Sequence, residues 1–304
     1  MTEGGSVAEP DETTEAVPPR APGHLRTVLA RLLVLGAVFT VAVGGVWVVA
    51  TAAGPSAGPT RSDIPALSLR PADVEPGSEA PVHDSESGPR ATDSASATTG
   101  RPRTLQEWAD RLAPAVGVPP RALLAYGNAE LIVADELPGC GLSWSTLAGI
   151  GRVESDHGRH GGAVLGDDGR PSRPIIGIAL DGSPGVKAIT DTDGGVLDGD
   201  AKHDRAVGPM QFIPSTWSLV GVDASGDGRA DPQQIDDAAL SAAFYLCAHG
   251  RDLATGDGWW DGVLSYNHSV DYGRTVFGLA EHYAELAAEL ARTAFEESGG
   301  AEGR

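Results

Sequence analysis

The chain has 304 residues, of which 41% are hydrophobic and 21% are charged, and its formal net charge is −20 at pH 7. This length allows one large domain or two small ones. The acidic balance argues against nucleic acid as a partner, because a nucleic-acid surface needs a basic patch that neutralises phosphates.

The N-terminal part predicts one membrane-spanning helix. Residues 27–53 are almost wholly apolar, interrupted only by Arg31, and their core is long enough to cross a bilayer. Basic residues precede this run and none follows until Arg61, so the positive-inside rule places 1–26 in the cytoplasm as a disordered tail. We expect a single-pass protein of the cytoplasmic membrane whose remainder is extracytoplasmic. The alternative is a cleaved signal peptide and a secreted protein.

A linker and a folded domain are expected to follow. Residues 54–103 are rich in Pro, Ser, Gly and Ala and lack aromatic residues, so they bury too little apolar surface to fold and predict a disordered tether. The folded domain is expected over 104–294, and a polar, disordered tail over 295–304.

The folded domain is expected to be mainly α-helical, with a long loop and a small β insertion. Its helices are recognised by apolar periodicity, capping residues and prolines. We expect helices from Thr104, from Pro119 to about Glu136, from Ser143 or Ser145 to Gly158, from Pro214, and over 236–249, 259–266 and 272–294. Residues 158–206 are rich in Gly, Asp and Pro, and the β-prone run 174–180 predicts a small hairpin there.

One acidic residue lies on the apolar side of the third expected helix. Glu154 follows Ile150 by four positions and Leu147 by seven, which places the three on one face. Apolar surroundings disfavour the charged form of a carboxyl group, so its pKa rises and it can hold a proton, as a general acid must. The spacing alone leaves a surface glutamate near a helix end as the alternative.

Three separated segments carry a family resemblance. They are Glu154-Ser155-x-x-Gly158, Gly208-Pro209-Met210-Gln211-Phe212-Ile213-Pro214-Ser215-Thr216-Trp217, and Ser265-Tyr266-Asn267. Their order and spacing over about 104–294 resemble the lytic murein transglycosylases of the membrane-bound B type. The resemblance implies a lysozyme-like helical fold and peptidoglycan glycan strands as the partner.

The resemblance also implies a mechanism in which Glu154 is the single catalytic acid/base. It would cleave the bond between N-acetylmuramic acid and N-acetylglucosamine and form a 1,6-anhydro ring without consuming water, and it would need no cofactor. Asp156, two positions on, projects away from Glu154 on a helix. The resemblance assigns substrate binding to Ser155, Met210, Gln211, Phe212, Tyr266 and Asn267. Packing in the core or the cleft wall is the alternative for Met210 and Phe212. A loop-to-helix hydrogen bond is the alternative for Gln211, and a buried, hydrogen-bonded tyrosine for Tyr266. Three tryptophans suit either stacking on sugars or core packing: Trp217, Trp259 and Trp260.

Two other functions compete with this one. A muramidase would hydrolyse the same bond with water and release reducing ends. A non-catalytic wall-binding protein would use the same cleft without chemistry. Retention of Glu154, Gln211 and Tyr266 together argues against the second alternative.

A further motif reads as a metal loop. Asp223, Ser225 and Asp227 stand at the first ligand positions of an EF-hand loop, and Arg229 would offer its backbone carbonyl. The usual glutamate at the twelfth position is missing, and by the family resemblance Asp237 would complete the site. We expect a structural Ca²⁺ here; the alternative is a Gly/Asp turn that caps the next helix.

The chain has two cysteines, Cys140 and Cys247. Both belong to the part expected to be exported, where oxidation is permitted. We expect a disulfide between them, and two buried free thiols are the alternative. Neither has a Cys or His neighbour at metal-ligand spacing.

Overall fold

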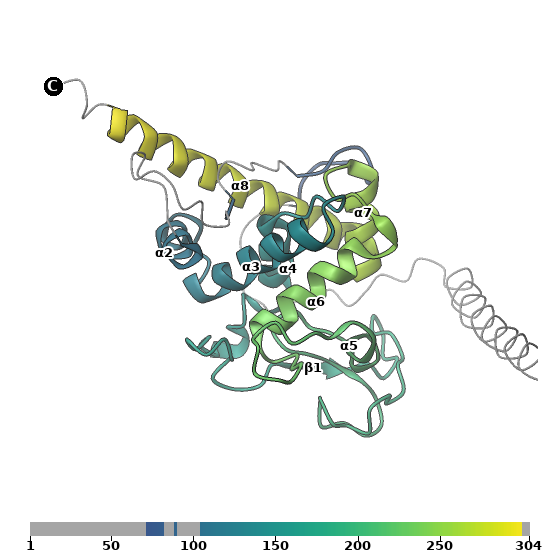
Figure 1. Cartoon of the computed structure of the whole chain (residues 1–304). Coiled ribbons are helices and arrows are strands. Elements are labelled where there is room, and N and C mark those ends of the chain that lie inside the picture. The colour runs from purple at the N-terminus through teal and green to yellow at the C-terminus, as the bar shows by residue number, and fades with distance from the viewer. Residues whose placement is uncertain (1–70, 82–87, 90–103, 300–304) are drawn as a thin grey trace, which may run out of the picture. The chain divides into compact units, whose positions relative to one another are not determined.

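The computed structural model describes residues 71–81, 88–89 and 104–299 (Figure 1). The chain divides into two units, 1–54 and 55–304, and all described residues belong to the second. The expected cytoplasmic tail at 1–26 and transmembrane helix at 27–53 lie outside the described residues. Within the described part, none of the helices is both long enough and apolar enough to span a membrane.

Helices dominate the described domain, as the sequence predicts. Their bounds are α2 Leu105–Val116, α3 Pro120–Glu136, α4 Trp144–Ser155, α5 Pro214–Val220, α6 Ile235–Cys247, α7 Gly256–Tyr266 and α8 Val270–Gly299, with 3-10 turns η1 at His160–Gly162 and η2 at Ala248–Gly250. Helix α8 is longer than expected at both ends. It includes residues 295–299, assigned above to a disordered tail, because no glycine or proline lies between Gly278 and Gly299 to end the helix.

Capping side chains set where several helices begin. Thr104 and Glu107 form the expected capping box, with Thr104 Oγ1 accepting from the Glu107 amide at 3.1 Å. Ser143, the earlier of the two expected starts, caps α4. Thr255 caps α7, so this helix begins at Gly256 and not at the tryptophan pair three residues later.

The core of the domain is built around α4. This helix contacts α3, α6 and α8 (Figure 1), and its Leu147 and Ile150 are both 0% exposed. Trp217, Trp259 and Trp260 are buried as well, so these rings belong to the core and are not sugar-stacking platforms. Burying side chains of this size stabilises the fold by about 1.5–3 kcal/mol each.

Residues 158–206, called the aspartate-rich lobe below, contain the expected β insertion. Strand β1 (Ile176–Ala179) pairs antiparallel with β2 (Arg205–Val207). The run 174–180 predicts β1, whereas nothing local predicts β2. The lobe has little apolar packing of its own, since both isoleucines of β1 are exposed.

Hydrogen bonds from backbone amides to carboxylates shape much of this lobe. The Asp191 carboxylate accepts from the Gly194 amide at 2.9 Å, and the buried Asp204 accepts from the Thr192 amide at 2.8 Å. Such side chain–backbone bonds replace the ladder that a regular sheet would supply. The many aspartates of this segment are therefore structural in large part.

Cys140 and Cys247 form a disulfide, which is the pairing expected from the sequence. The two Cα atoms are 5.5 Å apart, within the usual range for such a bond. The bond ties the loop before α4 to the end of α6. It thereby fixes the start of the helix that carries Glu154.

Residues 71–81, called the strap below, lie inside the segment expected to be a disordered linker. They instead pack on the domain, and Val74 is only 6% exposed within the hydrophobic core. The Ala72 amide donates to the carbonyl of Arg274 in α8 at 3.1 Å. Average composition misses this contact because one buried valine and a few backbone hydrogen bonds are enough to dock a short segment.

Candidate active site

Glu154 lies half-buried in the last turn of α4. The helix ends directly after Ser155 because Asp156 and His157 adopt left-handed backbone conformations, with φ of 53° and 57°. The expected stop at Gly158, whose φ is 83°, completes this turn. The chain therefore leaves the helix one residue after Glu154.

Ser155 connects this helix end to the second motif. Its hydroxyl donates to the carbonyl of Pro209 at 2.6 Å and accepts from the Gly158 amide at 2.8 Å. Its side chain is fully buried, so it does not reach a substrate as expected. Ser155 instead holds the segment 208–211 against the end of α4, next to Glu154.

Gln211 presents a buried acceptor with no partner. Its side-chain amide donates to the Gly208 carbonyl at 2.8 Å, whereas its Oε1 makes no hydrogen bond to any part of the chain that the structure describes. A buried polar atom without a partner is costly, and such atoms gather where a ligand supplies the missing group. The left-handed φ of 51° at Gln211 is a further strain in this segment.

Only glycine fits at the start of this segment. Gly208 has a φ of +79°, and a Cβ there would lie 1.7 Å from the carbonyl oxygen of Pro232. Any side chain would force the two backbones apart. Gly208 therefore lets the chain turn so that Gln211 faces inward.

Tyr266 lies near Glu154 but donates elsewhere. Its hydroxyl donates to the carbonyl of Met210 at 2.7 Å. Burial, together with the nearby charge of Glu154, raises the pKa of the Tyr266 hydroxyl well above its usual value. Met210 and Phe212 are 0% and 3% exposed, so they support the site from the core and do not bind substrate directly.

Tyr272 is the residue that sequence reasoning missed. Its hydroxyl donates to Glu154 Oε1 at 2.8 Å, and burial followed by the charge of Glu154 raises its pKa well above the usual value. It lies in the first turn of α8, which packs on α4. Asn267 ends α7, and its side chain accepts from the Ser269 amide at 3.2 Å, so it shapes the short turn between the two tyrosine-bearing helices.

His157 is a second residue that sequence reasoning did not single out. It is 1% exposed, and its Nδ1 and Nε2 lie 3.2 Å and 3.4 Å from the hydroxyls of Tyr126 and Tyr283. Burial, and then the charges of Arg159 and Arg152, hold the pKa of His157 well below its ordinary value. A neutral imidazole therefore anchors the turn that follows Glu154.

Asp156, the nearest other carboxylate in sequence, is engaged in ion pairs. It bonds Arg152 of the same helix and Arg159, the latter at 2.8 Å. Its left-handed backbone directs it away from the helix, in line with the expected divergence from Glu154. The arrangement thus offers Glu154 as the carboxyl group for acid–base chemistry.

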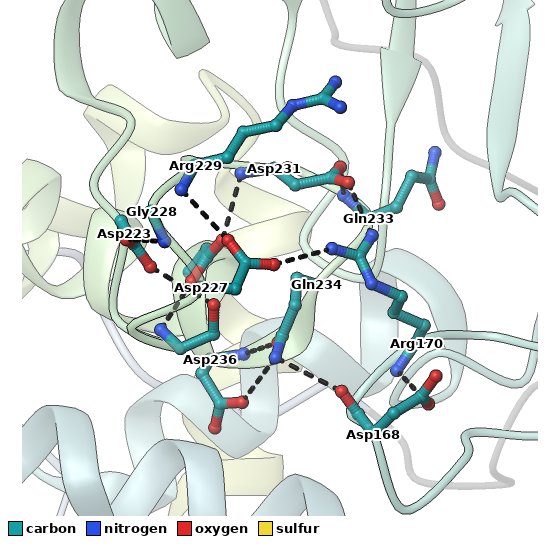
Figure 2. A network of polar contacts seen from close by, with 12 residues as sticks. Asp168, Arg170, Asp223, Asp227, Gly228, Arg229, Asp231, Gln233, Gln234 and Asp236 are labelled. Atoms are coloured by element: carbon teal, nitrogen blue, oxygen red, sulfur yellow. Dashed lines mark hydrogen bonds and ion pairs between the residues drawn. The ribbon is translucent and has the colours of Figure 1, made fainter.

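The predicted metal loop is a hydrogen-bonded turn in this structure (Figure 2). Asp223 accepts from the amides of Gly226 and Gly228, both at 2.7 Å. The buried Asp237 accepts from three backbone amides of the loop. Arg170 reaches across from the aspartate-rich lobe and pairs with Asp227 and Asp231, at 3.3 and 2.5 Å.

The donor types of this loop suit Ca²⁺, which takes oxygen ligands at 2.3–2.6 Å. Ligands of one ion therefore lie within about 5 Å of one another. Among the described residues, three carboxylates meet within 4.8 Å at Asp191, Asp193 and Asp204, and not in the loop 223–237. The calcium site at Asp223, Ser225, Asp227, Arg229 and Asp237 thus stays a prediction, and no step of the chemistry depends on it.

Comparison with known families supports the resemblance over one part of the chain. Residues 204–261 match the family model of the transglycosylase SLT domain. The matched segment contains Gln211, the predicted metal loop and α6. Among curated proteins, no sequence matches the chain.

Two similar solved structures are of the lytic transglycosylase Slt35 from Escherichia coli. The complex with bulgecin A is 17% identical, with a TM-score of 0.38, over 59% of this chain and 75% of that one. The complex with calcium is 17% identical, with a TM-score of 0.39, over 59% and 76%. At this level of similarity, neither structure assigns a role to any residue here.

Proposed function

We propose that this protein is a peptidoglycan lytic transglycosylase of the membrane-bound B type, with a lysozyme-like fold and Glu154 as its single general acid/base. The observation that carries the proposal is the hydrogen bond from Tyr272 to Glu154 Oε1 at 2.8 Å, made where α4 meets the segment of Gln211. The SLT domain match at 204–261 supports the same activity.

The proposed reaction begins with protonated Glu154. It gives its proton to the oxygen that joins N-acetylmuramic acid to N-acetylglucosamine, and the bond from this oxygen to the anomeric carbon breaks. The resulting carboxylate then takes a proton from the 6-hydroxyl of the muramoyl sugar. That oxygen bonds to the anomeric carbon and closes the 1,6-anhydro ring, so Glu154 recovers its proton and no water is consumed.

The surrounding residues serve this proton transfer in the proposal. Tyr272 fixes the orientation of the Glu154 carboxyl group, which must meet two different oxygens in turn. The unpartnered Oε1 of Gln211 accepts a hydrogen bond from a hydroxyl or amide of the glycan. Positioning of reacting groups lowers the reaction barrier in addition to the proton transfer itself.

The location of the activity is also a proposal. Peptidoglycan lies outside the cytoplasmic membrane, so the domain must be exported to meet it. The apolar run 27–53 would anchor it there, and the disulfide between Cys140 and Cys247 is of a kind common in oxidising compartments.

Mass spectrometry of digested peptidoglycan tests the proposal. We expect 1,6-anhydromuramoyl ends from the wild type, and a rate about 100- to 10,000-fold lower from Glu154→Gln, since general acid–base groups supply about 10²–10⁴-fold. Glu136→Gln is the matched control, because Glu136 is exposed at the end of α3. It should leave the rate unchanged.

The products also separate the competing functions. Reducing muramoyl ends that take up labelled water oxygen would mean hydrolysis and would contradict ring closure. Intact glycan strands with retained sacculus binding would mean a wall-binding protein without activity. Normal cleavage by Glu154→Gln would mean that another residue is the acid.

A further inference from the structure

The strap (71–81) contacts the helices that supply both tyrosines of the candidate site. Its first half is bound to the start of α8: the Ala72 amide donates to the Arg274 carbonyl at 3.1 Å, and Arg274 Nε donates to the Val74 carbonyl at 3.0 Å. Val74 itself enters the hydrophobic core. This half of the strap therefore fixes the first turns of α8.

The second half of the strap is bound to α7. Trp260 Nε1 donates to the carbonyl of Glu79 at 3.1 Å. Gly256, at the start of α7, leaves room for the strap, because a Cβ there would lie 2.7 Å from the carbonyl oxygen of Gly77. A side chain at this position would displace the strap.

The two contacts meet on the same helical turn. The Trp260 ring packs so closely on Gly273 that a Cβ there would lie 2.6 Å from a ring atom. Gly273 and Arg274 directly follow Tyr272. The strap thus holds the two residues after Tyr272: Arg274 through two hydrogen bonds, and Gly273 through the Trp260 ring.

We propose that the strap is a positioning segment of the active site, which holds the first turn of α8 so that the Tyr272 hydroxyl meets Glu154. This inference rests on the proposed role of Glu154. The strap touches no reacting atom, and acts by keeping a 2.8 Å hydrogen bond in place. A displacement of about 1 Å in such a site can lower the rate by about 100-fold.

The first test compares Val74→Asp with Val196→Asp in the full chain. Val74 is 6% exposed and Val196 is 78% exposed, so only the first change should expel the strap. We expect Val74→Asp to lower kcat about 10-fold with KM within about twofold, because orientation of the acid is lost while the glycan still binds. Val74→Ile, which keeps an apolar side chain in the core, should have the kcat of the wild type. Val196→Asp should also leave kcat unchanged.

The second test asks whether the strap acts through Tyr272. In a Tyr272→Phe background, Val74→Asp should lower kcat by less than about twofold, since the group that the strap positions is already gone. Independent, multiplicative effects would overturn the proposal. If Val74→Asp unfolds the protein, Arg274→Ala replaces it in the same double-mutant cycle with Tyr272→Phe, because the Arg274 side chain is 28% exposed.

The third test does not depend on activity. The chain has five tyrosines, so fluorine NMR of fluorotyrosine-labelled protein gives few signals, and Tyr272→Phe assigns the one of interest. We expect that signal to shift in Val74→Asp and to stay in place in Val196→Asp. An unmoved signal in a folded Val74→Asp protein overturns the proposal. If the Tyr272 signal shifts in Val74→Asp but the wild-type protein forms no anhydro ends, the strap still positions Tyr272 and only the proposed function is wrong.

Discussion

The helical domain around α4 and the aspartate-rich lobe are stabilised by different interactions. The helical part buries large apolar side chains and keeps its inner titratable groups neutral: burial raises the pKa of Glu130 to about 8 and lowers that of His157. The lobe relies on ionised carboxylates instead. Amide donors, foremost that of Lys202, and the Arg205 side chain lower the pKa of Asp200 there.

This difference separates the tasks of the two regions. The helical part holds Glu154 and Tyr272 in a packed environment that limits their movement. Gln211 lies just after the lobe, on a segment with positive φ values at Gly208 and Gln211. Glu154 is thus positioned by packing, and Gln211 by a tight backbone turn.

Among the changes that compare the two regions, the largest effect is expected where the lobe joins the helices. Gly208→Ala should lower kcat/KM about 100-fold and the free energy of unfolding by about 3 kcal/mol, because the new Cβ meets Pro232 and displaces Gln211. Gly199→Ala is the control: its φ of +78° is similar, but its Cβ would meet nothing within 4 Å. It should show only backbone strain, about 1 kcal/mol. Thermal unfolding measures the stability of each variant, and the rate of glycan cleavage measures its kcat/KM. Equal losses in Gly208→Ala and Gly199→Ala would contradict this account.

A smaller effect is expected from the tyrosine of the helical part. Tyr272→Phe removes the hydroxyl that meets Glu154 and should lower kcat about 10-fold, while the buried ring keeps the fold intact. Tyr245→Phe is the comparison, since its hydroxyl donates to the Ser265 carbonyl and not to Glu154. Steady-state kinetics separate them. A loss in KM alone would mean that Tyr272 binds glycan and does not orient the acid.

The smallest effect is a pH dependence of stability. Because burial lowers the pKa of His157, the unfolded chain binds this proton first, and the free energy of unfolding falls as pH drops below about 6.5. The slope is at most about 1.4 kcal/mol per pH unit. His157→Gln should remove it, and His268→Gln, at an exposed position, should not. Urea unfolding at pH 5, 6 and 7 checks this, at concentrations set by the ~1–3 kcal/mol/M slope of small domains.

Local spacing predicted much of the helical part. The capping box at Thr104, the helix of Glu154 and the partner of Cys140 follow from neighbouring residues or from elimination. Tyr272 did not, because its role depends on which turn of α8 faces α4, a contact across more than a hundred residues. Strap docking is long-range in the same way.

The sequence motifs indicated which residues lie near the candidate site better than they indicated where each side chain points. Met210 belongs to the motif of Gln211 and was assigned to substrate binding, yet its side chain is fully buried. Ser155 follows the same pattern. A short motif fixes which residues lie together, while the local backbone conformation decides which side chain points outward.

The disulfide between Cys140 and Cys247 has a consequence for chain breakage. The cysteines are 107 positions apart and enclose α4, the whole aspartate-rich lobe and α6 in one covalent ring. A protease that cuts an exposed loop of the lobe would open the ring without releasing either piece. Glu154 and Gln211 would remain covalently connected to the rest of the protein, so a single nick there would change the gel pattern only after reduction.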